Sequence, residues 1–344
     1  MNIKFFNKYR KLLPLTVYCS IGAILLITMF SICYFREKFL SLDIPKTINY
    51  QEYERHYALI TSNVDLPFWE SVYKEIKTEA KKHNAYVEYI GKNLSAAYDT
   101  KILLRIAIDC GVDGIIIEGD ESTEVAELID EAVKKGITVI TVLKDSPKSS
   151  RQCFVGVNNY NLGKAYGQQV LKILDENTRR ILVLIDSSNP DTSKNIIYSS
   201  IKETIQKGSA KNKLVNVEAV TVNNENTFSS EEAIRDIIMD AQHLPDIMIC
   251  LNGIDTQCAY QAVVDHNKVG KVDILGYYNS QDILSAVQKE IIHSTIAIDA
   301  KQMGDLCVQA LNEYKTMGHV SDYLSVDTKL ITLENVNKYL KNEN

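Results

Sequence analysis

The longest apolar stretch of the chain is an uncharged run from Leu12 to Phe35. At about 1.5 Å per helical residue, the run is long enough to cross a hydrocarbon core of about 30 Å. Basic residues precede it, namely Lys4, Lys8, Arg10 and Lys11. By the positive-inside rule, the N-terminus then lies in the cytoplasm and the chain from about residue 40 onward lies outside. We expect a single-pass protein of the cell membrane with an extracytoplasmic domain.

A cleaved signal peptide is the alternative interpretation of this run. It would need a shorter apolar region of about 7–15 residues and a small-residue cleavage site, and the exit segment FSICYFREKF contains no such site. We therefore expect residues 1–11 to be a basic cytoplasmic segment, residues 12–35 a retained transmembrane anchor, and residues 36–55 a polar juxtamembrane spacer.

Beyond the spacer, short apolar runs alternate with segments of helical period. The runs expected to be strands are Tyr57–Thr61, Tyr86–Ile90, Gly114–Ile117, Thr138–Val142, Cys153–Val157, Arg180–Ile185, Val215–Val222, Ile247–Leu251, Asp273–Leu275 and Thr295–Ile298. Between them, apolar positions such as Val125, Leu128, Ile129, Ala132 and Val133 recur on one face of a helix. This alternation predicts βαβ units with a parallel sheet. It restarts after a helix near Tyr160–Leu174, so the expected fold class is α/β, with two doubly wound parallel-sheet lobes preceded by one transmembrane helix.

The composition changes this picture little. The chain has 45% hydrophobic and 24% charged residues and a net charge of -6, which is typical of a globular protein and gives no basic surface for nucleic acid. The motifs of metalloproteases, P-loop enzymes, serine hydrolases and dinucleotide-binding enzymes are missing from the sequence. We expect no enzyme, no cofactor and no metal. Glu118 and Asp120 follow a strand and are placed to line a cleft, but two carboxylates alone do not indicate catalysis.

Five cysteines follow the apolar run, without the spacing of a metal or redox site: Cys110, Cys153, Cys250, Cys258 and Cys307. Cys110, Cys250, Cys258 and Cys307 each lie on an apolar strand or helix pattern, which predicts buried free thiols at those four positions.

Several segments resemble the periplasmic sugar-binding proteins of the ribose/galactose/xylose type, which are type I periplasmic binding proteins. In the first lobe they are ALITSNVDLPFWESVYKEIKTEAKKH, GVDGIIIEGDESTEVAELIDEAVKKGITVITV and CFVGVNNYNLGKAYG, and in the second lobe DIMICLNGIDTQCAYQAV, DILGYYNSQD and IIHSTIAIDAKQMG. The resemblance covers nearly all of residues 56 to 335. The same fold occurs in the effector lobes of sugar-responsive repressors, but here a membrane anchor precedes the lobes in place of a helix-turn-helix.

The resemblance implies an N-terminal lobe of residues 56–157 plus 300–324 and a C-terminal lobe of residues 158–299 plus 325–344. The lobes would be joined by a three-strand hinge, near Val157–Asn159, Ile298–Ala300 and Leu324–Val326. Among these residues, Asn158, Asn159 and Asp299 are the hinge candidates. Open parallel sheets bind ligands at the carboxyl ends of their strands, so the ligand is expected between the lobes.

The resemblance also implies candidate ligand-binding residues. Phe68 and Trp69 stand where the family stacks two aromatic side chains on a sugar ring; the alternative is that they pack the start of a helix. Ser62 is a polar residue at the end of the first strand, and Lys144 stands where many members have Arg. Asn252 matches an Asn that binds ligand hydroxyls, and it is equally suited to cap the next helix.

Other positions depart from the family pattern. Polar residues of the family are replaced by Leu66, Leu143, Ile197, Tyr278 and Ile298, of which Tyr278 remains a candidate ligand-binding residue. A shift of one or two positions in register would bring back polar groups, namely Asp65, Asp145, Asn195, Asn279 or Asp299. An unpaired buried hydroxyl costs about 1–3 kcal/mol, so ribose with the usual contacts is not the expected ligand. The alternatives are a different sugar, a less polar small molecule or no ligand.

These observations predict a membrane-anchored extracytoplasmic protein that binds a small molecule, with a sugar as the first candidate, and closes its lobes on it. An uncleaved anchor with an altered sugar pocket favours signalling to a membrane sensor histidine kinase. The alternative is the substrate-binding component of a sugar ABC transporter, which would meet an ABC permease. An extracytoplasmic enzyme on this fold is the third hypothesis.

Overall fold

The computed structural model describes residues 25–34, 52–64, 66–94, 98–186, 192–209, 215–223 and 227–340. The chain divides into two units, residues 1–52 and 53–344. In the first unit, residues 25–34 are helical and their side chains are exposed. The predicted cytoplasmic segment, most of the predicted anchor and nearly all of the spacer lie outside the described residues. Within the ranges described, no helix has the length and apolar character needed to cross a membrane.

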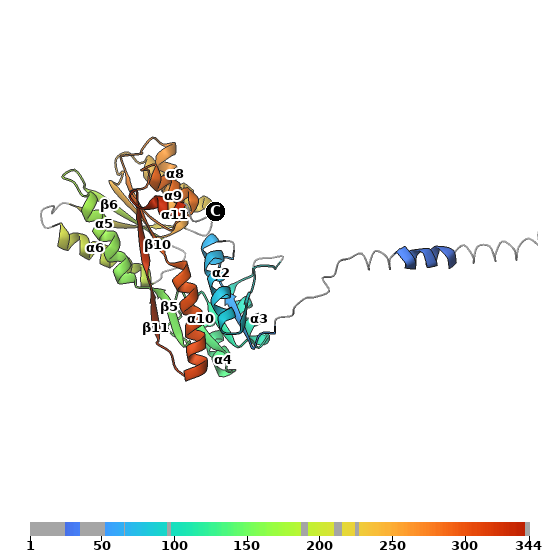
Figure 1. Ribbon diagram of the computed structural model, residues 1–344. Coiled ribbons are helices and arrows are strands. Elements are labelled where there is room, and N and C mark those ends of the chain that lie inside the picture. Colours follow the sequence, from blue (N-terminus) through green and yellow to red (C-terminus); the bar gives the residue numbers. More distant parts are fainter. Residues whose placement is uncertain are drawn as a thin grey trace, which may run out of the picture. The chain divides into compact units, whose positions relative to one another are not determined.

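The second unit contains two α/β lobes, each built on a six-stranded sheet (Figure 1). The first sheet has the order β11-β5-β4-β3-β1-β2, with β1 (Arg55–Ile60), β2 (Ala85–Tyr89), β3 (Gly114–Ile117), β4 (Thr138–Val142), β5 (Cys153–Val157) and β11 (Tyr323–Val326). The second has the order β12-β10-β9-β8-β6-β7, with β6 (Arg180–Asp186), β7 (Asn216–Val222), β8 (Ile247–Cys250), β9 (Asp273–Tyr277), β10 (Ser294–Ile298) and β12 (Thr328–Thr332). The pairings are parallel except that β12 runs antiparallel to β10. The predicted fold class of two parallel-sheet lobes is confirmed.

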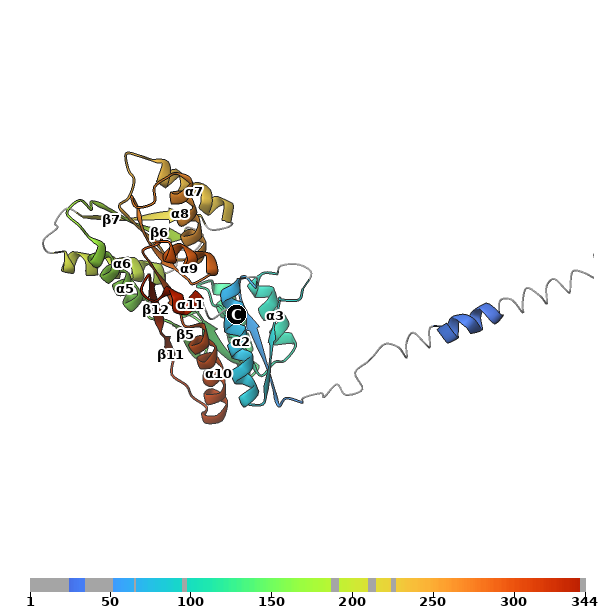
Figure 2. The ribbon, with the colours of Figure 1, turned by 45° about the horizontal axis from the view of Figure 1, so that its top comes forward.

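Helices cover both faces of each sheet (Figure 2). In the first lobe, α2 (Pro67–Lys82) and α10 (Ala300–Met317) pack on one face, and α3 (Thr100–Asp109) and α4 (Thr123–Lys134) on the other. In the second lobe, α5 (Asn159–Ile173) and α6 (Thr192–Gly208) pack on one face, and α7 (Thr227–Met239), α8 (Gly253–Asp265), α9 (Gln281–Gln288) and α11 (Val336–Leu340) on the other. One cluster of buried apolar side chains includes residues of both lobes, so the two lobes share part of their core.

The apolar pattern explains why these segments take these forms. Strands β3 and β8 lie inside their sheets, and every one of their residues is buried, as expected for parallel strands covered on both faces. Helix α4 buries Val125 and Ile129 against the sheet, and its first turn is capped by Ser122, whose Oγ accepts a hydrogen bond from the Val125 N–H.

The chain passes between the two sheets at three places. The first crossing lies at Asn158, between β5 and α5, and the second at Asp299, between β10 and α10. Each of these residues caps the helix that follows: Asn158 Oδ1 accepts from the Asn161 N–H at 2.9 Å, and Asp299 Oδ1 accepts from the Gln302 N–H at 3.2 Å. The hinge candidate Asn159 is the first residue of α5.

The third crossing lies at Asp327, between β11 and β12. The sequence placed it near Leu324–Val326. The crossing lies directly after that range, because Leu324, Ser325 and Val326 still pair with β5 in the first sheet.

Crossings two and three are joined directly. The Asp299 N–H donates to the Asp327 carbonyl at 3.0 Å, and the Asp327 N–H donates to Gln302 Oε1 at 2.6 Å. Lys329 Nζ lies 2.6 Å from Asp299 Oδ2. Burial by itself would raise the pKa of Asp299, but the hydrogen bond from Lys329 and the helix N–H groups outweigh it and hold the pKa below its ordinary value.

The cysteines largely follow the sequence. Cys250, Cys258 and Cys307 are free and buried, as predicted, and so is Cys153. Burial raises the pKa of the Cys153 thiol to about 12 and that of Cys258 to about 11, so these side chains stay protonated and unreactive at neutral pH. Cys110 is exposed, and the prediction of a buried thiol there was wrong. The reason is that Cys110 follows the last turn of α3 as its C-cap, outside the apolar face of that helix.

Candidate functional site

The polar centre of the first lobe is Glu118, directly after β3. Its side chain is 4% exposed, and both carboxylate oxygens are bonded. Oε2 accepts from the Ser62 N–H at 2.9 Å and from Ser62 Oγ at 2.6 Å, while Oε1 lies 2.8 Å from Lys144 Nζ. Ser62 and Lys144, both predicted from the sequence, are thus brought together at the carboxyl ends of β1 and β4 by a third residue.

The backbone directs Lys144 toward Glu118. Leu143 has φ 65°, in the left-handed region, and the Lys144 N–H donates to the Val142 carbonyl at 2.7 Å in a tight three-residue turn. The Gly119 N–H donates to the Lys144 carbonyl at 3.1 Å. A Cβ at Gly119 would lie 2.8 Å from that carbonyl oxygen, so only glycine allows the loops after β3 and β4 to approach this closely.

In the second lobe, Asn252 is the N-cap of α8, which was one of the two roles the sequence left open. Its Oδ1 accepts from the Asp255 N–H at 2.8 Å, and its Nδ2 donates to Asp255 Oδ2 at 2.6 Å. An amide nitrogen carries two hydrogens, so a second donor remains for a ligand hydroxyl.

Tyr278 lies next to Asn252. It follows β9 with φ 82°, and a Cβ at Gly253 would be in contact with the Tyr278 side chain at 3.4 Å. Thr256 links the two loops, because its Oγ1 donates to the Asn252 carbonyl at 2.7 Å and accepts from the Tyr277 N–H at 2.9 Å.

Phe68, at the start of α2 in the first lobe, reaches Tyr278. The ring centroids are 6.1 Å apart at an interplanar angle of 78°, an edge-to-face contact. This aromatic contact joins the two lobes. Trp69 lies differently: it is 1% exposed and belongs to the shared core. In this conformation no face of Trp69 is open to a ligand, whereas Phe68 is half-buried beside Tyr278.

The positions that depart from the family pattern fall into two groups. Ile197 and Ile298 are core residues, 7% and 8% exposed, whereas Leu66 is 38% exposed. Of the polar alternatives, Asp145 is held by both guanidinium bonds of Arg151, at 2.6 and 2.7 Å. Asp299 is a helix cap, Asn195 is exposed on α6, and Asn279 is half-buried after Tyr278. Asp65 lies outside the described residues.

The arrangement offers hydrogen-bonding groups on both lobes, around Glu118 in the first and at Asn252 in the second, and an aromatic pair between them. From the sequence, Glu118 is expected only to line the cleft. Its position directly after a fully buried strand indicates that it lies at the carboxyl edge of the first sheet. In the described part of the chain, no cluster of His, Cys, Asp and Glu has the arrangement of a metal site.

Comparison with known proteins identifies the family. The model of the periplasmic binding protein domain matches residues 57–318. The ribose import binding protein RbsB of Bacillus subtilis (strain 168) is 21% identical over 277 residues, which is 80% of this chain and 86% of that protein.

Solved structures share the fold. A glucose-galactose binding protein, GanP from Geobacillus stearothermophilus, superposes with a TM-score of 0.72 at 22% identity, covering 82% of this chain and 98% of the other. A structure described as the XylFII-LytSN complex gives a TM-score of 0.68 at 21% identity, covering 81% and 98%.

Proposed function

The chain belongs to the periplasmic binding protein domain family, and we propose that it is a membrane-anchored, extracytoplasmic sugar-binding protein that closes on its ligand and signals to a membrane partner. The proposed partner is a sensor histidine kinase. The anchor is the apolar run from Leu12 to Phe35, with the N-terminus in the cytoplasm because the basic residues precede that run.

The observation that carries ligand binding is the Ser62–Glu118–Lys144 cluster. A buried carboxylate fixes a hydroxyl and an ammonium group at the carboxyl edge of the sheet, where open α/β sheets bind ligands. Lys144 is 39% exposed, so its ammonium group reaches the surface of the site while the ion pair with Glu118 holds it in place. Phe68 and Tyr278 supply an apolar surface suited to the C–H face of a sugar ring.

Closure would act through the crossings at Asn158, Asp299 and Asp327. A ligand that bridges Lys144 on one lobe and Asn252 on the other favours the closed form by its differential affinity for the two forms. The hydrogen bonds between Asp299, Gln302 and Asp327 make two of the crossings move together.

Two relatives bear on the readout. The XylFII-LytSN structure is a complex of a protein of this fold with a second protein, which supports a signalling partner. The ribose import binding protein supports the second candidate, delivery of a sugar to an ABC permease. An anchored chain with an altered pocket favours signalling over delivery.

The test of ligand binding is a thermal-shift screen of the full chain in detergent against pentoses, hexoses and polyols. A ligand at 100 times its dissociation constant is expected to add about 2.7 kcal/mol of stability. No shift with any member of the three classes would contradict sugar binding. Protease added to intact protoplasts should digest the chain beyond residue 55, and protection of that part would contradict the topology.

Signalling and delivery are separated by deletion of the gene. Loss of sugar-dependent transcription with unchanged uptake of the labelled sugar is the expected result. Loss of uptake with unchanged transcription would show that the second candidate is correct.

A further inference from the structure

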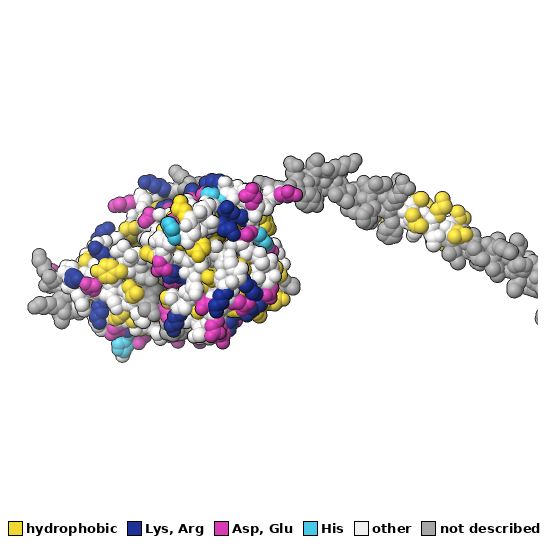
Figure 3. All heavy atoms as spheres, turned by 90° about the horizontal axis from the view of Figure 1, so that it is seen from below, with side chains coloured by type: hydrophobic (Ala, Val, Ile, Leu, Met, Phe, Trp, Pro, Cys, Tyr) yellow, Lys and Arg dark blue, Asp and Glu magenta, His cyan; other side chains and the backbone are white. Residues whose placement is uncertain are grey.

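The outer face of α2 carries a row of three lysines. Lys74, Lys77 and Lys81, here called the α2 lysine row, are exposed. Two carboxylates of the helix pair with other cations, Glu70 with Lys92 and Glu79 with Lys82 and His83. Among the described residues, no ion pair includes a lysine of the row. Elsewhere on the surface, acidic and basic side chains are interspersed, as Figure 3 shows for one face.

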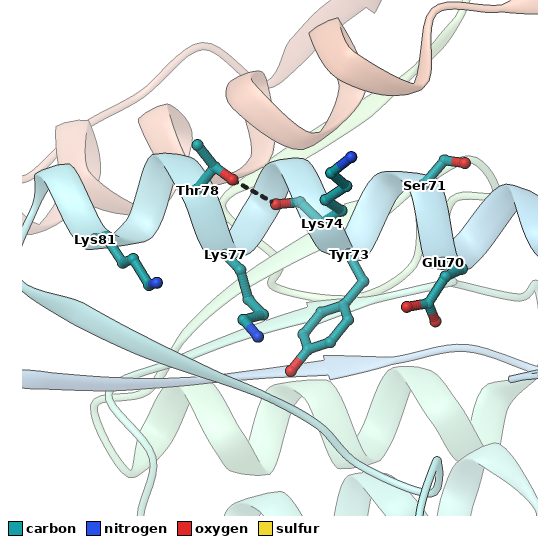
Figure 4. A pocket seen from close by; sticks show the side chains of 7 residues that line it. All are labelled: Glu70, Ser71, Tyr73, Lys74, Lys77, Thr78 and Lys81. Atoms are coloured by element: carbon teal, nitrogen blue, oxygen red, sulfur yellow. Dashed lines mark hydrogen bonds between the residues drawn. The ribbon is translucent and has the colours of Figure 1, made fainter. Parts of the chain in front are cut away.

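The row borders an open hollow of about 380 Å³, lined also by Glu70, Ser71, Tyr73 and Thr78. Figure 4 shows Lys77, Lys81 and Tyr73 on one side of the helix axis and Lys74 with the two hydroxyl residues on the other. Lys77 Nζ lies 5.5 Å from the centroid of the Tyr73 ring, a cation–π contact that holds this ammonium group at the edge of the hollow.

The chemistry of the hollow selects for carboxylates. Ser71 Oγ donates to the Pro67 carbonyl at 3.1 Å and Thr78 Oγ1 to the Lys74 carbonyl at 2.8 Å, so both hydroxyl protons are used within the helix. The donors that remain are ammonium groups at positions i, i+3 and i+7, spread over about 10 Å of helix. That spacing matches carboxylates repeated along one face of an acidic helix.

A protein segment fits this site better than a lipid surface does. A bilayer surface is flat on the scale of a few side chains and does not enter a hollow, whereas a helix or loop does. The chain as a whole has a net charge of -6, so an acidic partner is repelled by most of its surface and attracted by a local positive row.

Helix α2 also links this face to the ligand site. Its first turn carries Phe68, which contacts Tyr278 of the second lobe. Its other side packs closely on α10, where a Cβ at Gly304 would lie 3.0 Å from the Val72 carbonyl oxygen, and α10 begins at the crossing residue Asp299.

We infer that the α2 lysine row docks an acidic segment of the membrane partner. This inference rests on the proposed signalling function, and it assigns the surface through which closure of the lobes is read.

The test places a photoreactive phenylalanine analogue at Thr78 in the full-length chain in intact cells. The cross-linked peptide is then sequenced by mass spectrometry. The matched control places the analogue at Lys289, on the second lobe. We expect a cross-link to an acidic segment of a membrane protein from position 78 only. A cross-link to lipid, to a segment without acidic residues, or none at all would overturn the inference.

Charge reversal gives the second readout. The variant K74E/K77E/K81E should lower the cross-link yield at least tenfold and abolish sugar-dependent transcription, while K271E/K289E/K338E, with the same change in net charge, should alter neither by more than twofold. The sugar-induced thermal shift should persist in both variants. A shift missing from the unmodified chain would contradict the proposed function, whereas a normal transcriptional response in K74E/K77E/K81E would refute the docking surface alone.

Discussion

Replacing Glu118 by Gln tests whether the buried carboxylate organises the ligand site. Gln keeps the shape of the side chain but replaces one acceptor oxygen with a donor NH2 group. That group must face either Lys144 Nζ or the two Ser62 donors. In both orientations donors oppose donors at a site that is 4% exposed. The variant should therefore lose part of the cluster without leaving a cavity.

The size of the loss follows from burial. A hydrogen bond to a charged group is worth about 1.5–3 kcal/mol. Lys144 is 39% exposed and regains solvation when released, which reduces the effect. We expect Glu118→Gln to lower the free energy of unfolding by about 1–2 kcal/mol. Sugar affinity should fall about three- to tenfold, because Lys144 and Ser62 must then be ordered by the ligand itself.

The matched control is Glu124→Gln. Glu124 forms a pair with Lys101 at 2.6 Å, but its side chain is 70% exposed, so the change should cost less than about 0.5 kcal/mol. Urea unfolding gives both free energies, and isothermal titration calorimetry gives the affinities. Equal losses for the two variants, or unchanged affinity in Glu118→Gln, would refute the assignment of Glu118 as the organiser of the site.

Three further changes test other parts of the structure. Trp69→Ala should lower the free energy of unfolding by about 3–5 kcal/mol. In the unmodified protein, the fluorescence emission of this sole Trp should not respond to sugar, and a response would place the ring in the ligand site. Lys329→Met should destabilise the protein at pH 7. Lys329 holds the pKa of Asp299 low, so the stabilisation that the pair provides is present above about pH 3.9 and is lost at lower pH. The difference in free energy of unfolding between the unmodified protein and the variant, measured by urea unfolding, should therefore shrink at pH 3. A difference that stays constant with pH would exclude the Asp299–Lys329 pair as its source. Gly304→Ala should cost about 1–3 kcal/mol in the same assay because the new Cβ would lie 2.8 Å from Glu75 Cβ, and an unchanged midpoint would show that α2 and α10 can separate without loss.

The sequence predicted the fold well because parallel strands covered on both faces leave a strong pattern. Gly114–Ile117 and Thr138–Val142 were predicted with their observed bounds. The last two strands were missed. Tyr323–Val326 and Thr328–Thr332 are short, partly exposed and separated by one residue, so neither a continuous apolar run nor a clear alternation marks them.

The site was harder to predict because its residues are joined by contacts between distant segments. Ser62 and Lys144 were named individually, but the residue that joins them, Glu118, looks in sequence like any carboxylate after a strand. Trp69 was expected to stack on a sugar with its neighbour Phe68. Consecutive residues in a helix point about 100° apart, so when one faces the cleft the next can face the core.

The two lobes use equivalent positions for different chemistry. Strands β4 and β9 occupy the same place in their sheets, and each is followed by a left-handed residue that is not glycine, Leu143 at φ 65° and Tyr278 at φ 82°. Such a backbone costs about 1–2 kcal/mol, and strain of this kind concentrates at binding sites. In the first lobe the turn delivers the ammonium group of Lys144 to Glu118, and in the second it delivers an aromatic ring to Phe68. A ligand suited to both needs a hydroxyl-bearing edge and one apolar face, which a pyranose ring has and a uniformly polar or uniformly apolar molecule does not.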